Sequence, residues 1–353
     1  MADSVGRHFG ASAKFAASAN NPREAQPDRM AVIEERVPTR PARGVTTAAA
    51  VDIGSYSVHL LVAEVTRDGL RPRHDVSVSL GLGRTIDERG RLGEARGALL
   101  STLAEYASIA AGLGAGTLTI VGTDPLRRAA DGPEVVDEIR AATGLQVVVL
   151  SHEEEAFLAL LGVQEGRRLT RSTVMIDVGG GSTEVLLAGP DESPVAMGLP
   201  LGAARLTGIY IAHDPPTVGE LAMLQAEVAA TIANAPPYKP DRIVAVGGTA
   251  RSLLRIGPPL ANRVLTASRI HGALERLTGS PAAAIADRHG VRLSRARVLP
   301  AGAMILAGAL DRYRMDRLRV ALGGLREGMI LAAHHAGDGW RSQIRELARG
   351  WGR

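Results

Sequence analysis

Apolar and β-branched runs alternate with amphipathic segments along the first half of the chain. Residues 48–51 and 58–65 are rich in alanine, valine and leucine and flank a short Asp-Ile-Gly-Ser turn, a pattern typical of a β-hairpin. Farther on, apolar residues three and four apart predict helices, and short apolar runs predict strands. The predicted helices cover 94–113 and 133–143, and the predicted strands cover 117–121 and 145–150.

A second series of the same kind follows. Ser151 is placed to cap a helix, with Glu154 at the spacing of a capping box. The pattern then predicts strands at 173–176 and 184–188 around a glycine-rich turn, a helix over 217–235, a strand at 242–246, and a helix opened by Gly247-Gly248-Thr249. Two successive mixed series favour an α/β fold with two domains and an interdomain cleft.

The domain boundary is expected near residues 151–170, with the first domain over 48–155 and the second over 156–335. Residues 1–47 lack periodicity and contain four prolines, which is typical of a disordered N-terminal tail. Residues 336–353 are expected to form a C-terminal tail.

Composition narrows the class of protein. The 353 residues are 45% hydrophobic and 22% charged, as in globular proteins. The lack of cysteine excludes disulfides, thiolate metal sites and cysteine nucleophiles, and it fits a reducing, cytoplasmic compartment. No apolar run approaches the 18 residues of a membrane span, and no secretory signal is visible, so no membrane contact is expected. With 3% aromatic residues, a platform for stacking nucleic-acid bases is not expected.

The charge is unevenly distributed. Residues 1–250 carry 23 Lys and Arg against 30 Asp and Glu, a net of −7, whereas residues 251–320 carry 13 Arg against 4 acidic residues, a net of +9. Such a segment can attract a polyanion, although a solvated arginine-rich surface would have the same composition.

Two turns share one pattern, Asp52-Ile-Gly54-Ser55 and Asp177-Val-Gly179-Gly180-Gly181-Ser182. Glycines let backbone N–H groups approach a phosphoryl oxygen, and an aspartate at a strand end can hold Mg²⁺. A single such turn is usually structural, but a matched pair predicts two pseudo-symmetric domains that share one cleft. With the third glycine turn at 247–249, the chain resembles the actin/hexokinase/Hsp70-like superfamily, which implies two actin-like (ribonuclease H-like) α/β domains.

A closer resemblance covers residues 48–335. The chain is similar to the exopolyphosphatase / guanosine pentaphosphate phosphatase (Ppx/GppA) family in its short, two-domain form. The motifs that carry the resemblance occur in the family's order: Asp52-Ile-Gly-Ser-Tyr-Ser57-Val-His-Leu-Leu, Gly122-Thr-Asp-Pro-Leu-Arg127, Leu150-Ser-His-Glu-Glu-Glu155-Ala, Asp177-Val-Gly-Gly-Gly-Ser-Thr-Glu184, Gly198-Leu-Pro-Leu-Gly202-Ala-Ala-Arg-Leu, Gly247-Gly-Thr-Ala-Arg251 and Leu325-Arg-Glu-Gly328.

The resemblance implies a role for each matching residue. Glu155 matches the catalytic base that polarises a water for attack on a terminal phosphoryl group. Asp177 and Glu184 match ligands of Mg²⁺, or of Mn²⁺ in its place. The residues expected to bind substrate phosphates are Asp52, Gly54, Ser55, Arg127, Gly179, Gly180, Gly181, Ser182, Thr183, Gly247, Gly248, Thr249 and Arg326.

Plainer interpretations stand beside these roles. Glu155 could belong to a solvated acidic helix start, Glu184 could lie on a strand surface, and Arg326 could form a surface ion pair with Glu327. Arg128 and the pair His334-His335 are expected at the surface. Met304, Ile305 and Leu306 are expected in the core of a helix.

Three positions depart from the family pattern. Tyr56 stands where a small polar residue is usual, so its phenol either fills part of the cleft or points outward. His152 replaces a glycine before the acidic residues, and Asp131 replaces a frequent asparagine. None of these changes removes a catalytic group.

The leading hypothesis is an exopolyphosphatase that uses Mg²⁺ to remove terminal phosphate from inorganic polyphosphate. Hydrolysis of guanosine pentaphosphate is the alternative within the family. A non-catalytic sensor of polyphosphate or nucleotide is a second class, and a kinase of the superfamily is a third, disfavoured because the spacers leave little room for a substrate-binding insertion. The family also suggests a homodimer, and no element for nucleic-acid recognition is legible.

Overall fold

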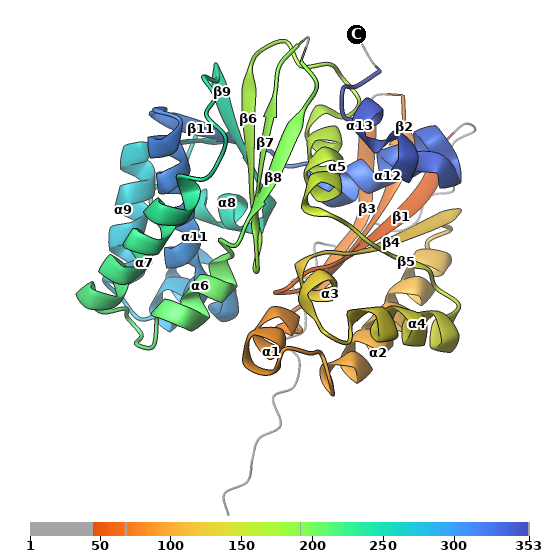
Figure 1. Cartoon of the computed structure of the whole chain (residues 1–353), viewed down its shortest axis with the longest axis horizontal. Helices are drawn as coiled ribbons and strands as arrows, with labels where there is room; N and C mark the ends of the chain where they lie inside the picture. The colour runs from red at the N-terminus through yellow and green to blue at the C-terminus, as the bar shows by residue number, and fades with distance from the viewer. Residues whose placement is uncertain (1–44, 68, 191, 352–353) are drawn as a thin grey trace, which may run out of the picture.

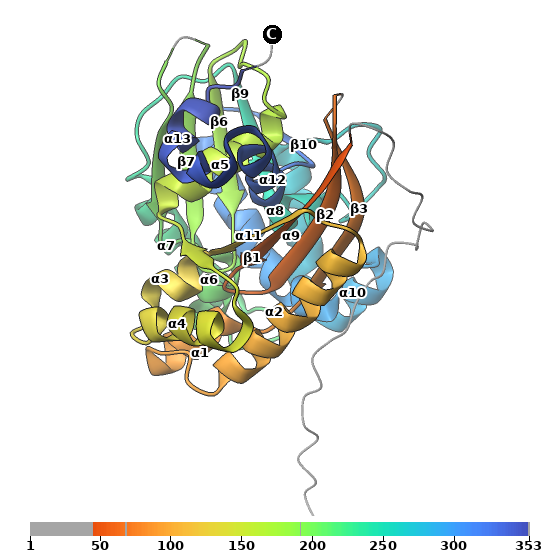
Figure 2. The same cartoon turned by 90° about the vertical axis from the view of Figure 1, so that its right-hand side faces the viewer.

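The computed structural model describes residues 45–67, 69–190 and 192–351. Two sheets stand side by side, and two helices, α5 (His152–Gln164) and α12 (Leu325–Ala336), pack between them (Figure 1). Further helices cover the outer face of each sheet, as Figure 2 shows from the side. The chain therefore builds a layered α/β structure with three hydrophobic cores, one outside each sheet and one between them.

The first sheet has five strands in the order β3-β2-β1-β4-β5. The hairpin expected from two apolar runs around a short turn is confirmed, since β1 and β2 pair antiparallel. Strands β4 and β5 continue the sheet in parallel. The strands are β1 (Thr46–Ile53), β2 (Val58–Thr66), β3 (Gly69–Val78), β4 (Thr117–Gly122) and β5 (Val147–Val149).

Four helices accompany this sheet, of which α2 and α4 confirm the helical spacing read from the sequence. Their apolar faces meet the outer side of the sheet through Leu99, Leu103, Tyr106 and Ile139. The helices are α1 (Leu82–Arg89), α2 (Ala95–Gly112), α3 (Asp124–Arg128) and α4 (Gly132–Thr143).

The second sheet has six strands in the order β10-β11-β9-β6-β7-β8. Its predicted hairpin is also confirmed, because β6 and β7 pair antiparallel on either side of the glycine-rich turn. The strands are β6 (Thr173–Val178), β7 (Thr183–Ala188), β8 (Val195–Leu199), β9 (Arg242–Val246), β10 (Val264–Thr266) and β11 (Arg317–Val320).

Six helices pack around the outer face of the second sheet. Ile305 and Leu306 of α11 are fully buried and Met304 is partly buried, so this helix forms core as expected. Of the described helices, α11 alone has the length and hydropathy to cross a membrane, and 67% of that segment is buried inside the protein. The helices are α6 (Ala203–Tyr210), α7 (Val218–Ile232), α8 (Gly247–Leu253), α9 (Ala267–Thr278), α10 (Ala282–His289) and α11 (Leu293–Arg312).

Helices α5 and α12 pack closely because glycines stand at their contact. A β-carbon at Gly162 would lie 2.0 Å from the carbonyl oxygen of Gly324, and one at Gly328 would lie 1.8 Å from that of Leu158. No β-carbon fits at such distances, so glycine is required at both positions. The predicted N-cap of α5 is confirmed, since the Ser151 hydroxyl accepts from the Glu154 N–H at 3.1 Å.

The last segment of the chain continues onto this pair of helices. After a short 3₁₀ turn (Gly337–Gly339), α13 (Trp340–Leu347) buries Trp340, Ile344 and Leu347 in the core shared with α5 and α12. The residues expected to form a C-terminal tail thus include a packed helix. His334 and His335 are exposed, as expected.

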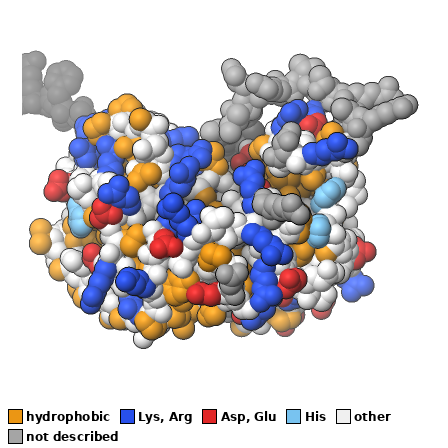
Figure 3. Space-filling view, turned by 90° about the horizontal axis from the view of Figure 1, so that it is seen from above, with side chains coloured by type: hydrophobic (Ala, Val, Ile, Leu, Met, Phe, Trp, Pro, Cys, Tyr) orange, Lys and Arg blue, Asp and Glu red, His pale blue; other side chains and the backbone are white. Residues whose placement is uncertain are grey.

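At the other end, β1 begins at Thr46, inside the segment expected to be a disordered tail, while residues 1–44 lie outside the described residues. The exact domain limits remain predictions. Seen from above, basic side chains are spread over both halves of the surface, with acidic and hydrophobic ones between them (Figure 3). On this face, therefore, positive charge does not gather over one half alone.

Candidate active site

Two hairpin turns of matching construction meet at one cleft between the sheets. In the β1–β2 turn, the N–H of Gly54 donates to the Ser57 carbonyl at 3.1 Å, and in the β6–β7 turn the N–H of Gly179 donates to the Ser182 carbonyl at 3.0 Å. In both turns the aspartate of the repeat stands two residues before that glycine. The repeat expected from the sequence is present, and its first glycine N–H closes each turn.

The two turns approach so closely that only glycine fits between them. A β-carbon at Gly180 would lie 2.9 Å from Cβ of Tyr56, and one at Gly181 would lie 2.0 Å from Oδ2 of Asp124 and 2.5 Å from Oγ of Ser55. Among the described residues, the N–H groups of Gly180 and Gly181 donate to no backbone acceptor. They are therefore free to donate to a bound anion.

Most residues expected in the site line this one cleft, together with α8 and the segment that leads into α12. The expected residues that line the cleft are Asp52, Gly54, Ser55, Glu155, Asp177, Gly179, Gly180, Gly181, Ser182, Gly247, Gly248 and Arg326.

Three expected phosphate ligands, Arg127, Thr183 and Thr249, are not among the residues that line the cleft, and neither is the expected metal ligand Glu184. The hydroxyl of Thr183 donates to the Leu201 carbonyl, and that of Thr249 donates to the Val178 carbonyl at 3.2 Å. Thr183 begins a strand, where successive side chains point to opposite faces, so it turns away from the side taken by Ser182. Both hydroxyls hold the backbone around the turns.

Arg127 lies beside Glu155 at the edge of the cleft. From α3, its Nη1 donates to Oε2 of Glu155 at 2.7 Å and to the Leu150 carbonyl at 2.8 Å. The two side chains are 14% and 12% exposed. Its Nε is buried without a hydrogen-bond partner, which leaves one donor unused. Glu155 is therefore a buried, arginine-paired carboxylate and not part of a solvated helix start.

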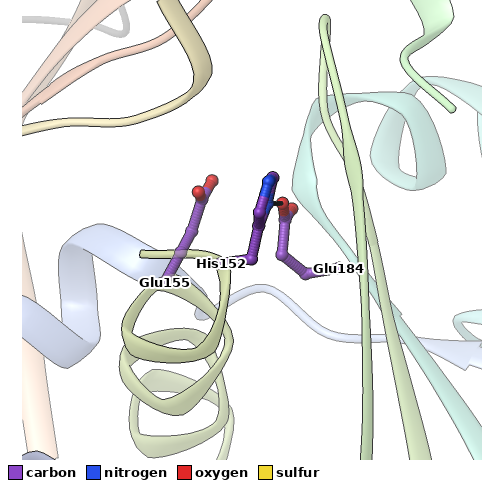
Figure 4. A group of neighbouring side chains, drawn as sticks. All are labelled: His152, Glu155 and Glu184. Atoms are coloured by element: carbon purple, nitrogen blue, oxygen red, sulfur yellow. Dashed lines mark hydrogen bonds and ion pairs between the residues drawn. The ribbon is translucent and has the colours of Figure 1, made fainter. Parts of the chain in front are cut away.

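Glu184 and His152 complete this group (Figure 4). Oε1 of Glu184 accepts from the Ser182 hydroxyl at 2.8 Å and lies 2.8 Å from Nδ1 of His152. Glu184 is 1% exposed, which excludes the strand-surface alternative. Ligand atoms of His152, Glu155 and Glu184 lie within 4.8 Å of one another, a spacing at which they could hold a metal ion. In the sequence, His152 stood out only because it replaces a glycine of the family pattern.

Burial raises the pKa of four carboxyl groups of the site. The pKa of Asp52 rises to about 7 and that of Asp177 to about 6, because burial disfavours the charged form. Burial and the nearby Asp177 raise the pKa of Glu184 to about 8. Burial and the neighbouring Glu184 raise the pKa of Glu155 well above its usual range. Carboxylates so close together ionise fully only when positive charge lies among them.

The donor groups fit a divalent cation. Oδ1 of Asp52 is buried with no hydrogen-bond partner, and Asp177 is close enough to raise its pKa. Asp177 and Glu184 stand opposite each other across the β6–β7 pair. Within the described part of the chain, the hydrogen bonds and ion pairs of the Glu184 side chain use Oε1, so Oε2 remains for a ligand. Such a set of oxygen atoms suits hard cations of the Mg²⁺ and Mn²⁺ type.

Arg326 lies in the wall of the cleft and does not form the surface pair considered for it. It is 6% exposed, its Nη1 donates to the carboxylate of Asp75 in β3, and it lies near Asp52. Glu327 instead accepts from the Gly324 N–H at 2.9 Å, at the start of α12. Arg326 is therefore a buried cation next to the first turn.

Arg295 of α11 is a cleft residue that the sequence analysis missed. Its guanidinium lies over the ring of Tyr56, 4.8 Å from the centroid, and it forms no ion pair with a carboxylate in the described part of the chain. Burial lowers its pKa. A half-buried arginine without an acidic partner is a strong candidate for anion binding. Only the positive charge of residues 251–320 hinted at it.

The other two departures from the family pattern also have defined positions in the structure. Tyr56 fills part of the cleft instead of pointing outward. Asp131 accepts from the N–H groups of Leu92 and Gly93 at 2.7 and 3.0 Å, so its role is to hold a loop. Arg128, expected at the surface, is half-buried and donates to Asp124, which in turn accepts from Ser55 at 2.5 Å. Asp124 was not singled out from the sequence.

Comparison with known proteins agrees with this geometry. A family model described as the Ppx/GppA phosphatase family matches residues 61–336. The chain belongs to this family. Exopolyphosphatase 1 of Mycobacterium tuberculosis is 33% identical over 300 residues, which cover 80% of this chain and 86% of that protein. Exopolyphosphatase 1 of Mycobacterium leprae is 32% identical over 299 residues, which cover 80% and 87%.

A solved structure supports the same assignment. The crystal structure of the Aquifex aeolicus member of the Ppx/GppA family superposes with a TM-score of 0.72 at 27% identity, covering 83% of this chain and 99% of that one. A second structure, of the Aquifex aeolicus PPX-GPPA enzyme, gives a TM-score of 0.68 at 28% identity, covering 82% and 99%. The predicted fold of two actin-like α/β domains is confirmed.

Proposed function

We propose that the protein is an exopolyphosphatase that hydrolyses the terminal phosphoanhydride bond of inorganic polyphosphate. The observation that carries the proposal is the position of Glu155, a buried carboxylate paired with Arg127 at the edge of a cleft walled by two phosphate-type turns. The named activity of the mycobacterial relatives supports the same substrate.

The terminal phosphoryl group would bind in the cleft that the two turns line. The unused N–H groups of Gly180 and Gly181 supply neutral donors, and Arg326 supplies a buried positive charge on the other wall. Preorganised donors of this kind stabilise the charge on the equatorial oxygens in the transition state of phosphoryl transfer. Arg127, whose Nε is unused, would add a contact from the side of Glu155.

Glu155 would act as the general base. Its carboxylate accepts a proton from water while the water oxygen attacks the terminal phosphorus in line with the leaving oxygen. The bond from phosphorus to the bridging oxygen then breaks, which releases orthophosphate and a polyphosphate shorter by one unit. The raised pKa of Glu155 gives this carboxylate the basicity that the role needs.

Asp177 and Glu184, with Asp52 across the cleft, are the residues that would hold Mg²⁺, and Mn²⁺ would suit the same oxygens. When bound, the cation supplies positive charge that neutralises the phosphate oxygens. These carboxylates keep their place through the strand pairing of each hairpin. A reducing, cytoplasmic location fits the absence of cysteine.

The lining of the cleft favours polyphosphate over guanosine pentaphosphate. Among the described lining residues, Tyr56 is the one tyrosine, phenylalanine or tryptophan, and Arg295 already covers its ring. A guanine base would therefore lack an open aromatic surface for stacking. Arg251 and Arg295 provide positive charge for phosphates beyond the terminal one.

The test is phosphate release from long-chain polyphosphate and from guanosine pentaphosphate with Mg²⁺. We expect polyphosphate to be shortened from its ends, and Glu155→Gln to reduce the rate by about a thousandfold, as for loss of a general base. Glu105→Gln, an exposed change on α2, serves as the control. Preference for guanosine pentaphosphate would favour the alternative activity, and binding of polyphosphate without release would favour a sensor.

A further inference from the structure

The first turn of α5 is held by arginines from two sides. Glu155 contacts Arg127 of α3 on the side of the cleft. On the opposite side, Arg341 of α13 donates from Nε and Nη2 to the two carboxylate oxygens of Glu154 at 2.6 and 3.1 Å. This two-point arrangement fixes orientation as well as distance, because the guanidinium and carboxylate planes must align.

The same two arginines also hold the connection that enters α5. Nη1 of Arg127 donates to the carbonyl of Leu150 at 2.8 Å, and Nη2 of Arg341 donates to the carbonyl of Val149 at 3.1 Å. Consecutive carbonyls are thus bound by groups from opposite sides of the chain. Arg341 thereby links the end of β5 to the first turn of α5.

Helix α13 is itself firmly seated. Its apolar residues lie in the core beside α5, as described above, and a second arginine, Arg345, donates to Glu153 at 2.5 Å and lies 5.3 Å from the ring centroid of Phe157. Farther along, the Trp351 N–H donates to the Gly166 carbonyl at 2.8 Å, just past the end of α5. The C-terminal segment therefore follows α5 over its whole length.

We propose that Arg341 is a positioning residue for catalysis: from the C-terminal helix it fixes the first turn of α5, and with it the carboxylate of Glu155. This inference rests on the proposed function. Arg341 touches neither the cleft nor Glu155, so its effect is transmitted through Glu154 and the backbone of that turn. A small displacement of a catalytic group lowers the rate far more than it lowers stability.

The experiment compares full-length variants by steady-state polyphosphate hydrolysis, melting temperature and hydrogen exchange of peptides that cover residues 150–156. Arg341→Gln should lower kcat about five- to tenfold and leave KM within twofold. Its melting temperature should change little, because an ion pair whose arginine is half exposed adds little stability. Arg341→Lys, which keeps the charge, should recover part of the loss.

Arg349→Gln is the matched control. It makes the same change in charge just beyond α13, where the Arg349 side chain bonds to Glu346 at 3.2 Å and to Ser193 but forms no hydrogen bond or ion pair with the described residues of α5. The proposal stands if Arg341→Gln alone lowers kcat and speeds exchange in the first turn of α5. It is overturned if the two variants have the same kcat, or if exchange in that turn does not change.

The exchange measurement separates this inference from the proposed function. If the wild-type protein releases no phosphate from polyphosphate, the proposed function fails. Faster exchange over residues 150–156 in Arg341→Gln, but not in Arg349→Gln, would then still show that Arg341 holds the first turn of α5. Equal exchange in the two variants would show that Arg341 does not hold this turn.

Discussion

Asp177 and Glu184 face each other across β6 and β7, whereas the residue that faces Asp52 across β1 and β2 is His59. The two turns match in length and hydrogen bonding, but the residues that pair with the two aspartates differ in charge. Burial and the nearby Arg326 lower the pKa of His59 well below its usual range, so its imidazole is neutral. The β6–β7 hairpin therefore has two paired carboxylates that can bind a cation. The β1–β2 hairpin has only one carboxylate at the matching pair, so it repels a phosphate less.

Replacement of Asp177 by asparagine should weaken the binding of the metal and lower the activity. With one carboxylate removed from the β6–β7 pair, we expect the Mg²⁺ concentration for half-maximal rate to rise and the rate at saturating Mg²⁺ to fall by about a hundredfold. Asp137→Asn, at an exposed position of α4, is the control. An unchanged Mg²⁺ titration of phosphate release would place the metal elsewhere.

Gly181→Ala should inactivate the enzyme while leaving it folded. The new β-carbon would lie 2.0 Å from Oδ2 of Asp124, so the turn must move away from Asp124. The N–H groups of residues 180 and 181 would then no longer point at the bound phosphate. We expect phosphate release to fall by about a hundredfold, since misplacement by an ångström has effects of that size. Gly208→Ala, on α6 with no atom within 4 Å of the new carbon, should be as active as wild type. Equal activity of both variants would contradict the role given to the turn.

Local patterns predicted the hairpins, their glycine turns and the N-cap of α5. Each depends on residues only a few positions apart, such as Ser151 and Glu154, whose reciprocal hydrogen bonds form within one helical turn. The internal repeat also predicted the cleft, because two copies of one turn imply two equivalent domains that face each other. The roles of Glu155 and Asp177 came from the family resemblance.

The features of the fold and the site that the sequence did not predict depend on packing between segments far apart in the chain. Nothing near Arg295 in the sequence shows that it meets Tyr56, which lies in the turn between β1 and β2. Thr183 and Thr249 carry suitable hydroxyls, but the direction of each side chain follows from strand pairing and helix packing. The helix α13 is short, and its core contacts appear only once α5 and α12 are in place.

Arg295→Gln should weaken substrate binding more than turnover. The guanidinium lines the cleft from α11 and lies over the ring of Tyr56, and we assign it to phosphates that do not react. Loss of a charged hydrogen bond worth about 1.5 kcal/mol would raise KM for polyphosphate about tenfold. Arg288→Gln, exposed on α10, is the control. A fall in kcat at constant KM would instead place Arg295 at the reacting phosphate.

Acid stability should depend on Glu220, far from the cleft chemistry. The N–H of Thr217, the side chain of His213 and the N–H of Ala212 all contact its carboxylate and lower its pKa from 4.5 to about 2. Because the folded state favours the ionised form, this contribution is complete above the unfolded pKa and is lost as the pH falls toward 2.

Melting temperatures of wild type and Glu220→Gln between pH 2 and pH 7 check this expectation. The variant should melt lower than wild type above pH 5, and the difference should shrink as the pH falls through the window between the two pKa values, because protonated glutamate then resembles glutamine. Glu275→Gln, an exposed change on α9, should follow wild type throughout. A difference that stays constant down to pH 2 would show that Glu220 acts by shape and packing, and not through the charge that its backbone donors stabilise.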